Sequence, residues 1–300
     1  MIKVNRLTPK AGTAAGPLAA AAAAATAAPV QTVAPAAAAA PTQAVLPTTP
    51  VLKPEEALQR AASLSLALPE DLFGSSITSL PVQEVQATVP FIGFASNRSP
   101  SWSSQQSAGL GDGDMYLQSS NGMTPLQECK FFMIDAFYCF TRINDNNEII
   151  EAKAQLTEAE IKADIYQEHY VCPIIVDTGE EMVPAKLELR GARAAAAKQV
   201  MNAIQTAATP EWATSSDAAR IASAFPAPWG RQTAWLRGAR RQARSTGRFY
   251  VQTTAAVRPT TLTDMEKIAK ASTDSAFTAT LAEVRSAINE RIEEMNAKAV

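Results

Sequence analysis

Hydrophobic and polar positions alternate most clearly in the middle of the chain, where runs rich in Val, Ile and aromatic residues are separated by short polar turns. Alternation with a period of two is typical of half-buried β-strands. The pattern predicts strands over Val85–Phe94, Val171–Asp177 and Phe249–Val257. Thr178 and Gly179 predict a turn after the second of these, with a returning strand over Met182–Leu189.

The most apolar of these runs, Lys130–Arg142, has aromatic or aliphatic side chains on both faces of an extended chain. A strand that is apolar on both faces is buried at the centre of a sheet. We therefore predict a single central strand over this run. The turn residues Asn144–Asn147 predict that it forms a hairpin with Glu148–Glu151.

Helices are predicted where the apolar spacing changes to three and four residues. A capping box at Thr157–Glu160 predicts a helix that ends near Gln167, and an Ala-rich helix is predicted over Gly191–Ala207. A second capping box, Thr263–Glu266, predicts the start of the last helix. Between the predicted strands, residues 95–114 are predicted to form a long polar loop.

The last predicted helix carries apolar residues at spacings of four, three, four, four and three. They form one stripe that is suited to packing or to self-association. Its members are Phe277, Leu281, Val284, Ile288, Ile292 and Met295.

Together these elements predict an α+β fold, with six or seven strands in an antiparallel sheet or a small OB-like barrel and with inserted helices. The predicted organisation has four parts. Residues 1–53 form a disordered Ala/Pro-rich tail, 54–80 a short helix and linker, 81–259 the α+β core domain, and 260–300 a C-terminal amphipathic helix.

The first part of the chain has no charged residue between Lys10 and Lys53, which favours a disordered tail or linker. The alternative is a secretory signal peptide whose positive region would be Lys3, Arg6 and Lys10. An odd count of three cysteines without CxxC spacing favours reduced thiols in a cytoplasmic protein. No stretch is apolar and long enough to predict a membrane span.

Charge is distributed unevenly along the chain. The segment Ala218–Thr263 contains eight arginines but no Asp, Glu or Lys, so it carries a net charge of +8 in a chain whose total is −2. Aromatic residues lie among these arginines. Arginine forks onto phosphate and aromatic rings stack on unpaired bases, so this composition favours a single-stranded nucleic acid as partner.

Eight residues of this segment are the candidate nucleic-acid-binding residues. The arginines would hold phosphates, and the two aromatic residues would stack bases. They are Arg231, Trp235, Arg237, Arg240, Arg241, Arg244, Arg248 and Tyr250. As a strand, residues 231, 235, 237 and 241 would share one face, whereas as a helix residues 237, 240, 241 and 244 would form a ridge. Trp102, in the polar loop, is a weaker stacking candidate.

Other interpretations of the basic segment remain open. Its charge could be a solvated surface, could contact a partner subunit, or could pair with the acidic segments Glu148–Glu168 and Glu180–Glu188. Trp229 and Trp235 could equally be core anchors, since a large ring is usually buried.

The sequence lacks a recognisable catalytic motif, so we do not predict an enzyme, a cofactor or a metal site. The single histidine, His169, makes an HxxC pair with Cys172, whose side chains would face opposite sides of a strand. Asp135 would have a raised pKa if it were buried, which would suit a general acid in a pocket lined by Phe131 and Phe137. The more ordinary role for Asp135 is a hydrogen bond to a neighbour.

The leading hypothesis is a nucleic-acid-binding accessory protein that favours single-stranded DNA, of the kind used in replication or recombination. It would form a homo-oligomer through the C-terminal helix and would not bind a membrane. The alternative is a structural or assembly protein, such as a component of a virus-like particle or oligomeric scaffold, without nucleic-acid binding.

Overall fold

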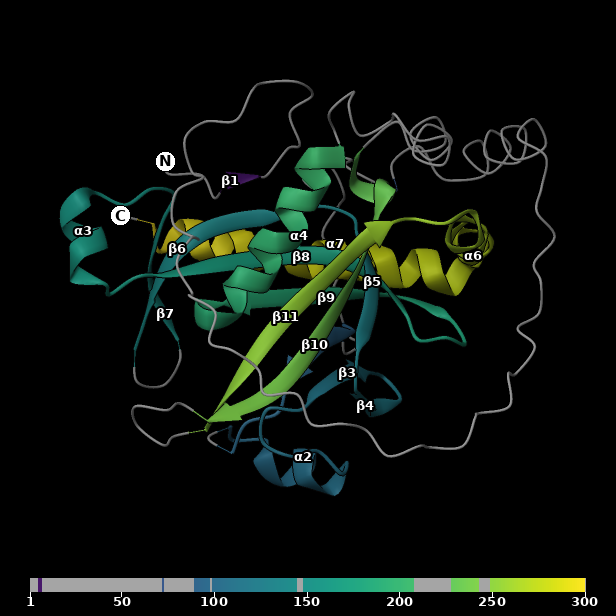
Figure 1. Ribbon diagram of the computed structural model, residues 1–300, viewed down its shortest axis with the longest axis horizontal. Coiled ribbons are helices and arrows are strands. Elements are labelled where there is room, and N and C mark those ends of the chain that lie inside the picture. Colours follow the sequence, from purple (N-terminus) through teal and green to yellow (C-terminus); the bar gives the residue numbers. More distant parts are fainter. Residues whose placement is uncertain are drawn as a thin grey trace, which may run out of the picture.

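The computed structural model (Figure 1) describes residues 5–6, 72, 89–97, 99–144, 148–207, 228–242 and 249–299, with the backbone alone at residues 5–6, 228, 239–242 and 249–251. In this part of the chain the fold is α+β, as predicted. Eleven strands form one curled, mixed sheet that resembles half of a barrel. The expected antiparallel arrangement is wrong at one pairing, because β2 and β9 run parallel. The sheet also holds more strands than the six or seven that were predicted.

The strands are β1 (Asn5–Arg6), β2 (Phe91–Phe94), β3 (Met115–Ser119), β4 (Gly122–Leu126), β5 (Cys129–Met133), β6 (Phe137–Ile143), β7 (Ile149–Lys153), β8 (Gln167–Asp177), β9 (Met182–Arg190), β10 (Gln232–Gln242) and β11 (Phe249–Pro259). Their main order is β11-β10-β5-β8-β9-β2-β3-β4, and β6 pairs with β1, β7 and β8.

The helical segments are α2 (Trp102–Ser107), α3 (Glu158–Ala163), η2 (Gly191–Arg193), α4 (Ala194–Ala207), η4 (Pro228–Arg231), α6 (Leu262–Ser272) and α7 (Ser275–Ala297). Helix α4 covers one face of the sheet, and α6 and α7 cover the other (Figure 1). No helix in the described residues is long and apolar enough to span a membrane.

The predicted strand over Lys130–Arg142 is in fact two strands, β5 and β6, and both pair with β8. Met133 lies opposite Ile174 and Phe137 lies opposite Val171, so this chain advances four residues where β8 advances three. The extra residue reverses the two faces, as it does in a β-bulge. Consequently Met133 packs on the α4 side whereas Phe137 packs on the α7 side.

The other predicted strands are confirmed with shifted ends. The first prediction is described only from residue 89 onward, and its last four residues form β2. The strand after α3 begins at Gln167, where the sequence predicted the end of a helix. The predicted hairpins β6–β7 and β8–β9 are both present. The hairpin β3–β4, over Met115–Leu126, was not predicted.

Two of the helix predictions are confirmed and one loop prediction is wrong in part. Thr157 and Glu160 form the capping box of α3, although that helix ends at Ala163. The Ala-rich helix is α4, and its buried residues include Val200 and Ile204. The polar loop contains the short helix α2, and its Trp102 packs against the cluster around Tyr116. That contact assigns Trp102 to the core side of the loop.

The predicted C-terminal helix is two helices, α6 and α7, separated by Thr273 and Asp274, and Asp274 caps α7. The capping box of α6 is formed by Thr261 and Asp264, two residues before the predicted position. Five residues of the apolar stripe are buried and Ile292 is partly buried, all against the chain's own sheet. Intramolecular packing therefore accounts for the stripe, and association of copies through other faces of α7 stays a prediction.

The tail and signal-peptide interpretations, the short helix after Pro54, and residues 85–88 of the first predicted strand lie outside the described residues.

A network of charged side chains joins the sheet to α6. The ammonium of Lys130 lies 2.9 Å from Asp177 and 2.6 Å from Asp264, and Lys267 lies 3.2 Å from Asp177. Burial alone would raise the pKa of Asp177, but hydrogen bonds from Lys130, the Gly179 N–H and Lys267 bring that pKa below its usual value. Burial would lower the pKa of Lys130, yet its two carboxylate partners raise it overall.

The packing of α4 yields a first prediction. Ile204 is completely buried between α4 and the sheet. We expect Ile204→Ala to lower the free energy of unfolding by about 2–5 kcal/mol, because the deleted methyl and methylene groups leave a cavity. The neighbouring exposed residue supplies the control, since Gln205→Ala should change the value by less than about 0.5 kcal/mol. Urea titration measures both, and equal effects would contradict this packing.

The network around Asp177 yields a prediction about pH. The folded-state pKa of this carboxyl is depressed. Its contribution to stability is therefore complete above the unfolded-state value of about 3.9 and is lost as the pH falls through the folded-state pKa. We expect Asp177→Asn to lower the free energy of unfolding at pH 7 by about 1–3 kcal/mol.

Below about pH 4, the same variant should lose less of its remaining stability than the wild-type chain, because it has no carboxylate there to protonate. Urea titrations at a series of acidic pH values would compare the two. Identical acid limbs would show that Asp177 does not hold the network together.

Candidate nucleic-acid interface

Most of the described basic segment forms a long antiparallel ribbon of β10 and β11. The register pairs Gln232 with Pro259 at one end and Gln242 with Phe249 at the other. Of the two local structures that the sequence allowed, the strand is therefore correct. The ribbon joins the rest of the sheet through β5, where Trp235 lies opposite Lys130.

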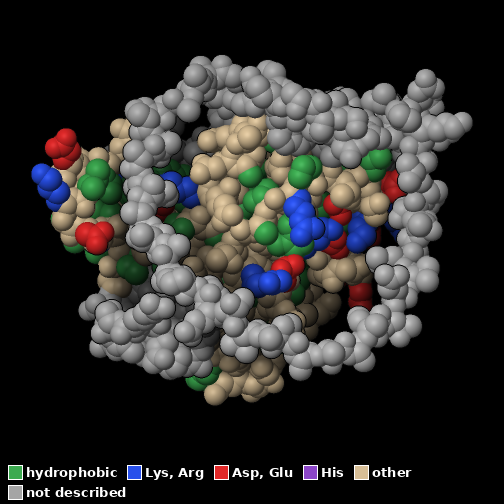
Figure 2. All heavy atoms as spheres, in the orientation of Figure 1, with side chains coloured by type: hydrophobic (Ala, Val, Ile, Leu, Met, Phe, Trp, Pro, Cys, Tyr) green, Lys and Arg blue, Asp and Glu red, His purple; other side chains and the backbone are tan. Residues whose placement is uncertain are grey.

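The two faces of the ribbon differ sharply in burial. Ala234, Leu236 and Ala255 point into the core beneath α4 and are almost fully buried. Residues on the opposite face alternate with them, as a period of two requires. On that outward face Trp235 is half-buried, while the side chains of Arg237, Thr254, Ala256 and Arg258 are exposed. Figure 2 shows Lys and Arg side chains, with Asp and Glu between them, over this ribbon near α6.

Trp235 lies at the centre of a three-stranded surface and is surrounded by cations. The guanidinium carbon of Arg258 lies 5.1 Å from the centroid of the indole ring, and the Lys130 ammonium lies 6.0 Å from it. Both distances are within the range of a cation–π interaction. The ring is thus held in place by charged neighbours and also keeps part of its surface exposed to solvent.

Arg237 lies next to this ring and pairs with an acid that precedes β5. Its guanidinium nitrogen lies 2.6 Å from the Glu128 carboxylate, and its side chain is 68% exposed. Small side chains on β11, Thr254 and Ala256, lie opposite Arg237 and Trp235 in the register. They leave a hollow of about 450 Å³ that these residues line together with Arg258.

Arg231 lies outside the ribbon, and its predicted role in binding stays a prediction. This residue ends η4 instead of lying on the strand, so the predicted face of residues 231, 235, 237 and 241 is wrong at its first member. Its guanidinium donates to the carbonyl of Ala207 at the end of α4, 2.9 Å away. Burial lowers the pKa of Arg231. The side chain therefore fastens η4 to α4.

Three of the remaining candidates, Arg240, Arg241 and Tyr250, lie toward the far end of the ribbon. The backbone register places Arg241 opposite Tyr250 and Arg240 opposite Val251. Arg244 and Arg248 lie outside the described residues, so their predicted roles stay predictions. The structure thus brings Trp235 and Arg237 together and adds Glu128, Lys130 and Arg258, which were not among the candidates.

The acidic segments considered as partners for the arginines make other contacts. Lys153 pairs with Glu151 and Glu160, and Lys198 pairs with Glu168. Glu188 lies near His169, Lys186 and Arg291. Burial would raise the pKa of Glu188, but these positively charged or hydrogen-bonding neighbours bring it well below its usual range. The described acidic partner of Arg237 is instead Glu128.

The burial and the contacts of Asp135 and His169 favour structural roles for both residues. Asp135 is completely buried where the chain passes from β5 to β6, and its carboxylate accepts a 2.8 Å hydrogen bond from the Ala136 N–H. Phe131 and Phe137 lie in clusters on opposite faces of the sheet, so they do not line one pocket with it. His169 is buried 3.4 Å from Glu188.

Cys172 belongs to the core on the α4 side, and burial raises its pKa far above the usual value. The pairing of β8 with β9 gives His169 and Cys172 opposite orientations, as predicted. In the residues that the structure describes, no group of three or more His, Cys, Asp or Glu side chains could hold a metal ion.

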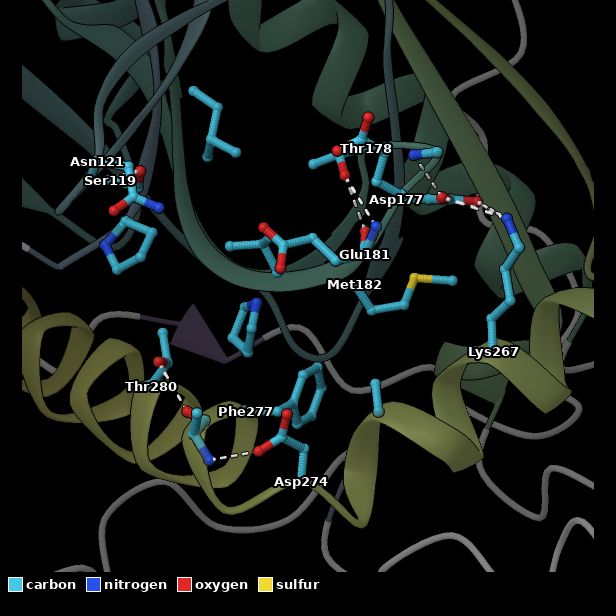
Figure 3. A pocket seen from close by; sticks show the side chains of 18 of the residues that line it. Ser119, Asn121, Asp177, Thr178, Glu181, Met182, Lys267, Asp274, Phe277 and Thr280 are labelled. Atoms are coloured by element: carbon cyan, nitrogen blue, oxygen red, sulfur yellow. Dashed lines mark hydrogen bonds and ion pairs between the residues drawn. The ribbon is translucent and has the colours of Figure 1, made fainter.

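A second cavity, of about 710 Å³, lies between the β8–β9 turn, the β3–β4 turn and the junction of α6 with α7 (Figure 3). Its apolar lining includes Met182 and Phe277. Asp177, Lys267 and Asp274 contribute charges of both signs at its edge. This mixed lining selects no single class of ligand.

The chain was compared with models of known protein families, with curated protein sequences and with solved structures, and none of them matches it.

Proposed function

We propose that this protein binds single-stranded nucleic acid on the outward face of the β10–β11 ribbon. One observation carries the proposal: Trp235 lies partly exposed between the cations Arg258 and Lys130, beside the exposed Arg237. A stacking surface beside phosphate-binding groups is the combination that an unpaired strand needs.

The exposed ring favours single strands over duplexes. Bases in a duplex already stack on one another, so their faces are closed to a protein side chain. Trp235 lies among side chains of three adjacent strands, and the register places the small residues Ala256 and Thr254 on one side of it. An unpaired base could enter this hollow with its face against the indole ring, whereas an intact duplex could offer only its phosphates.

The length of the ribbon supports an extended contact. β10 has eleven residues, which corresponds to roughly 35 Å at about 3.3 Å per residue. Four of the predicted phosphate-binding arginines lie beyond Arg237 along the same segment. They are Arg240, Arg241, Arg244 and Arg248. Arg241 lies an even number of positions from Trp235 and Arg237 on β10, so it would extend the basic track on the same face, whereas Arg240 has the opposite parity.

An accessory role in DNA replication or recombination inside the cell follows from this proposal, because those processes expose single strands. An OB-like identity belongs to the same proposal. The curled sheet supports it, while the eleven strands found among the described residues exceed the five of an OB fold. Binding through the ribbon does not depend on that identity, since fold and function are separable.

The first test of the proposal is binding of a labelled single strand of about 30 nucleotides, measured by fluorescence anisotropy at low salt. We expect Trp235→Ala to weaken binding by about 1–3 kcal/mol, the usual value for one stacked base. Lys162→Ala is the control, because it removes an exposed cation from α3, away from the ribbon (Figure 1). It should bind like the wild-type chain.

Folding of each variant is checked by circular dichroism and thermal unfolding. Absence of binding by the wild-type chain at low salt would overturn the proposal. Concentration-dependent association in light scattering, together with that absence, would instead favour a structural or assembly role.

The second test uses salt to measure how many phosphates the protein neutralises. For single strands, the slope of log affinity against log salt changes by about 0.7 for each phosphate that is neutralised. We therefore expect Arg237→Ala and Arg258→Ala each to reduce the slope by about that amount, whereas Trp235→Ala should leave it nearly unchanged. Unchanged slopes in both arginine variants would place the phosphate-binding groups elsewhere on the chain.

A further inference from the structure

An acid lies within the basic hollow on the ribbon. Glu128 lines the hollow together with Trp235, Arg237 and Arg258, and its side chain is 38% exposed. A carboxylate repels phosphate, so a surface that served phosphate alone would be better without it. Its position beside a stacking ring therefore requires a second explanation, which the chemistry of a nucleobase supplies.

The carboxylate is held in place and retains capacity to accept further hydrogen bonds. Arg237 donates to its Oε2 atom from 2.6 Å. An ionised carboxylate offers about four lone-pair sites on its two oxygens. One bond from Arg237 therefore orients the group without exhausting it, and both oxygens can accept from a base that enters the hollow.

The edges of the four bases differ in what they offer to a carboxylate. Guanine presents two adjacent donors, N1–H and the 2-amino group, which match the two oxygens. Cytosine and adenine each place one amino donor beside a ring-nitrogen acceptor, which the carboxylate repels. Thymine has one N–H between two carbonyl oxygens. A carboxylate beside a stacking ring thus selects guanine and disfavours thymine most strongly.

We infer that the hollow is a base-recognition site in which Glu128 selects guanine stacked on Trp235, while Arg237 and Arg258 hold neighbouring phosphates. This inference rests on the proposed function, since it assigns a base preference to the same surface. The volume of about 450 Å³ lies within the range of roughly 300–1,000 Å³ that is usual for small-molecule sites.

The test compares three labelled 12-nucleotide strands in the same anisotropy assay. One is a run of thymidines, one alternates thymidine with guanosine, and one alternates thymidine with inosine, which lacks the 2-amino group. We expect the wild-type chain to bind the guanosine strand about tenfold more tightly than the thymidine strand, which is within the range for a bidentate contact to a base. The inosine strand should lie between them.

The informative variant is Glu128→Gln, which keeps the shape of the side chain and removes its charge. It should reduce the preference for guanosine to less than about twofold, because the amide offers only one acceptor oxygen. Its affinity for the thymidine strand should stay the same or rise, because Arg237 is released from an anion. Glu290→Gln, at an exposed position on α7, is the matched control and should retain the wild-type preference.

The outcomes separate this inference from the proposed function. Binding of all three strands with equal affinity, or a guanosine preference that Glu128→Gln leaves unchanged, would overturn base recognition by Glu128 and leave strand binding intact. Failure of the wild-type chain to bind any of the three strands would overturn the proposed function and this inference with it.

Discussion

The fold depends on the burial of β8 on both of its faces. Tyr170, Cys172 and Ile174 pack on the α4 side, while Val171 and Ile175 pack on the side of α6 and α7. A strand in this position needs hydrogen-bonded neighbours along both edges. β9 supplies one edge, and β5 and β6 divide the other between them. The extra residue between those two strands allows each to present apolar side chains to the correct face.

This arrangement explains why the ribbon can carry a polar surface. β10 pairs with the edge of β5 that faces away from β8. The inward face of the ribbon therefore extends the core, to which it contributes Leu236 and Ala255. On the other face Trp235 is half-buried and Arg237 is exposed. The same hairpin therefore contributes to stability through one face and exposes the proposed binding surface on the other. Disruption of the inward packing would remove that proposed surface as well.

The sequence predicted the class of fold, most strands and helices, and the segment that forms the ribbon, because period-two patterns and caps are local signals. It could not predict the break between β5 and β6 at Asp135. A one-residue insertion is defined only by the register with the partner strand β8, which the local pattern does not contain. The alternation placed Trp235 and Arg237 on one face, whereas Arg258 joins them only through the hairpin register. Lys130 lies in a third strand, β5, and Glu128 is the residue before that strand. Both are far earlier in the chain than the ribbon. The contact of Arg231 with Ala207 is tertiary, so the sequence could not show it.

The internal ion pairs determine how a strand could bind here. Lys130 and Arg237 already have carboxylate partners, so a phosphate that approaches them competes with Asp177, Asp264 or Glu128. Asp177 and Asp264 are buried, and each accepts hydrogen bonds from donors besides Lys130. Lys130 therefore stays paired with them and acts as a cation beside the Trp235 ring. Glu128 is the most exposed of the three acids, so a phosphate can replace its carboxylate at Arg237 at a lower cost in free energy than it can replace Asp177 or Asp264 at Lys130. Arg237 has five N–H donors, so in the proposed site it can hold a phosphate while its hydrogen bond keeps the Glu128 carboxylate oriented toward a base.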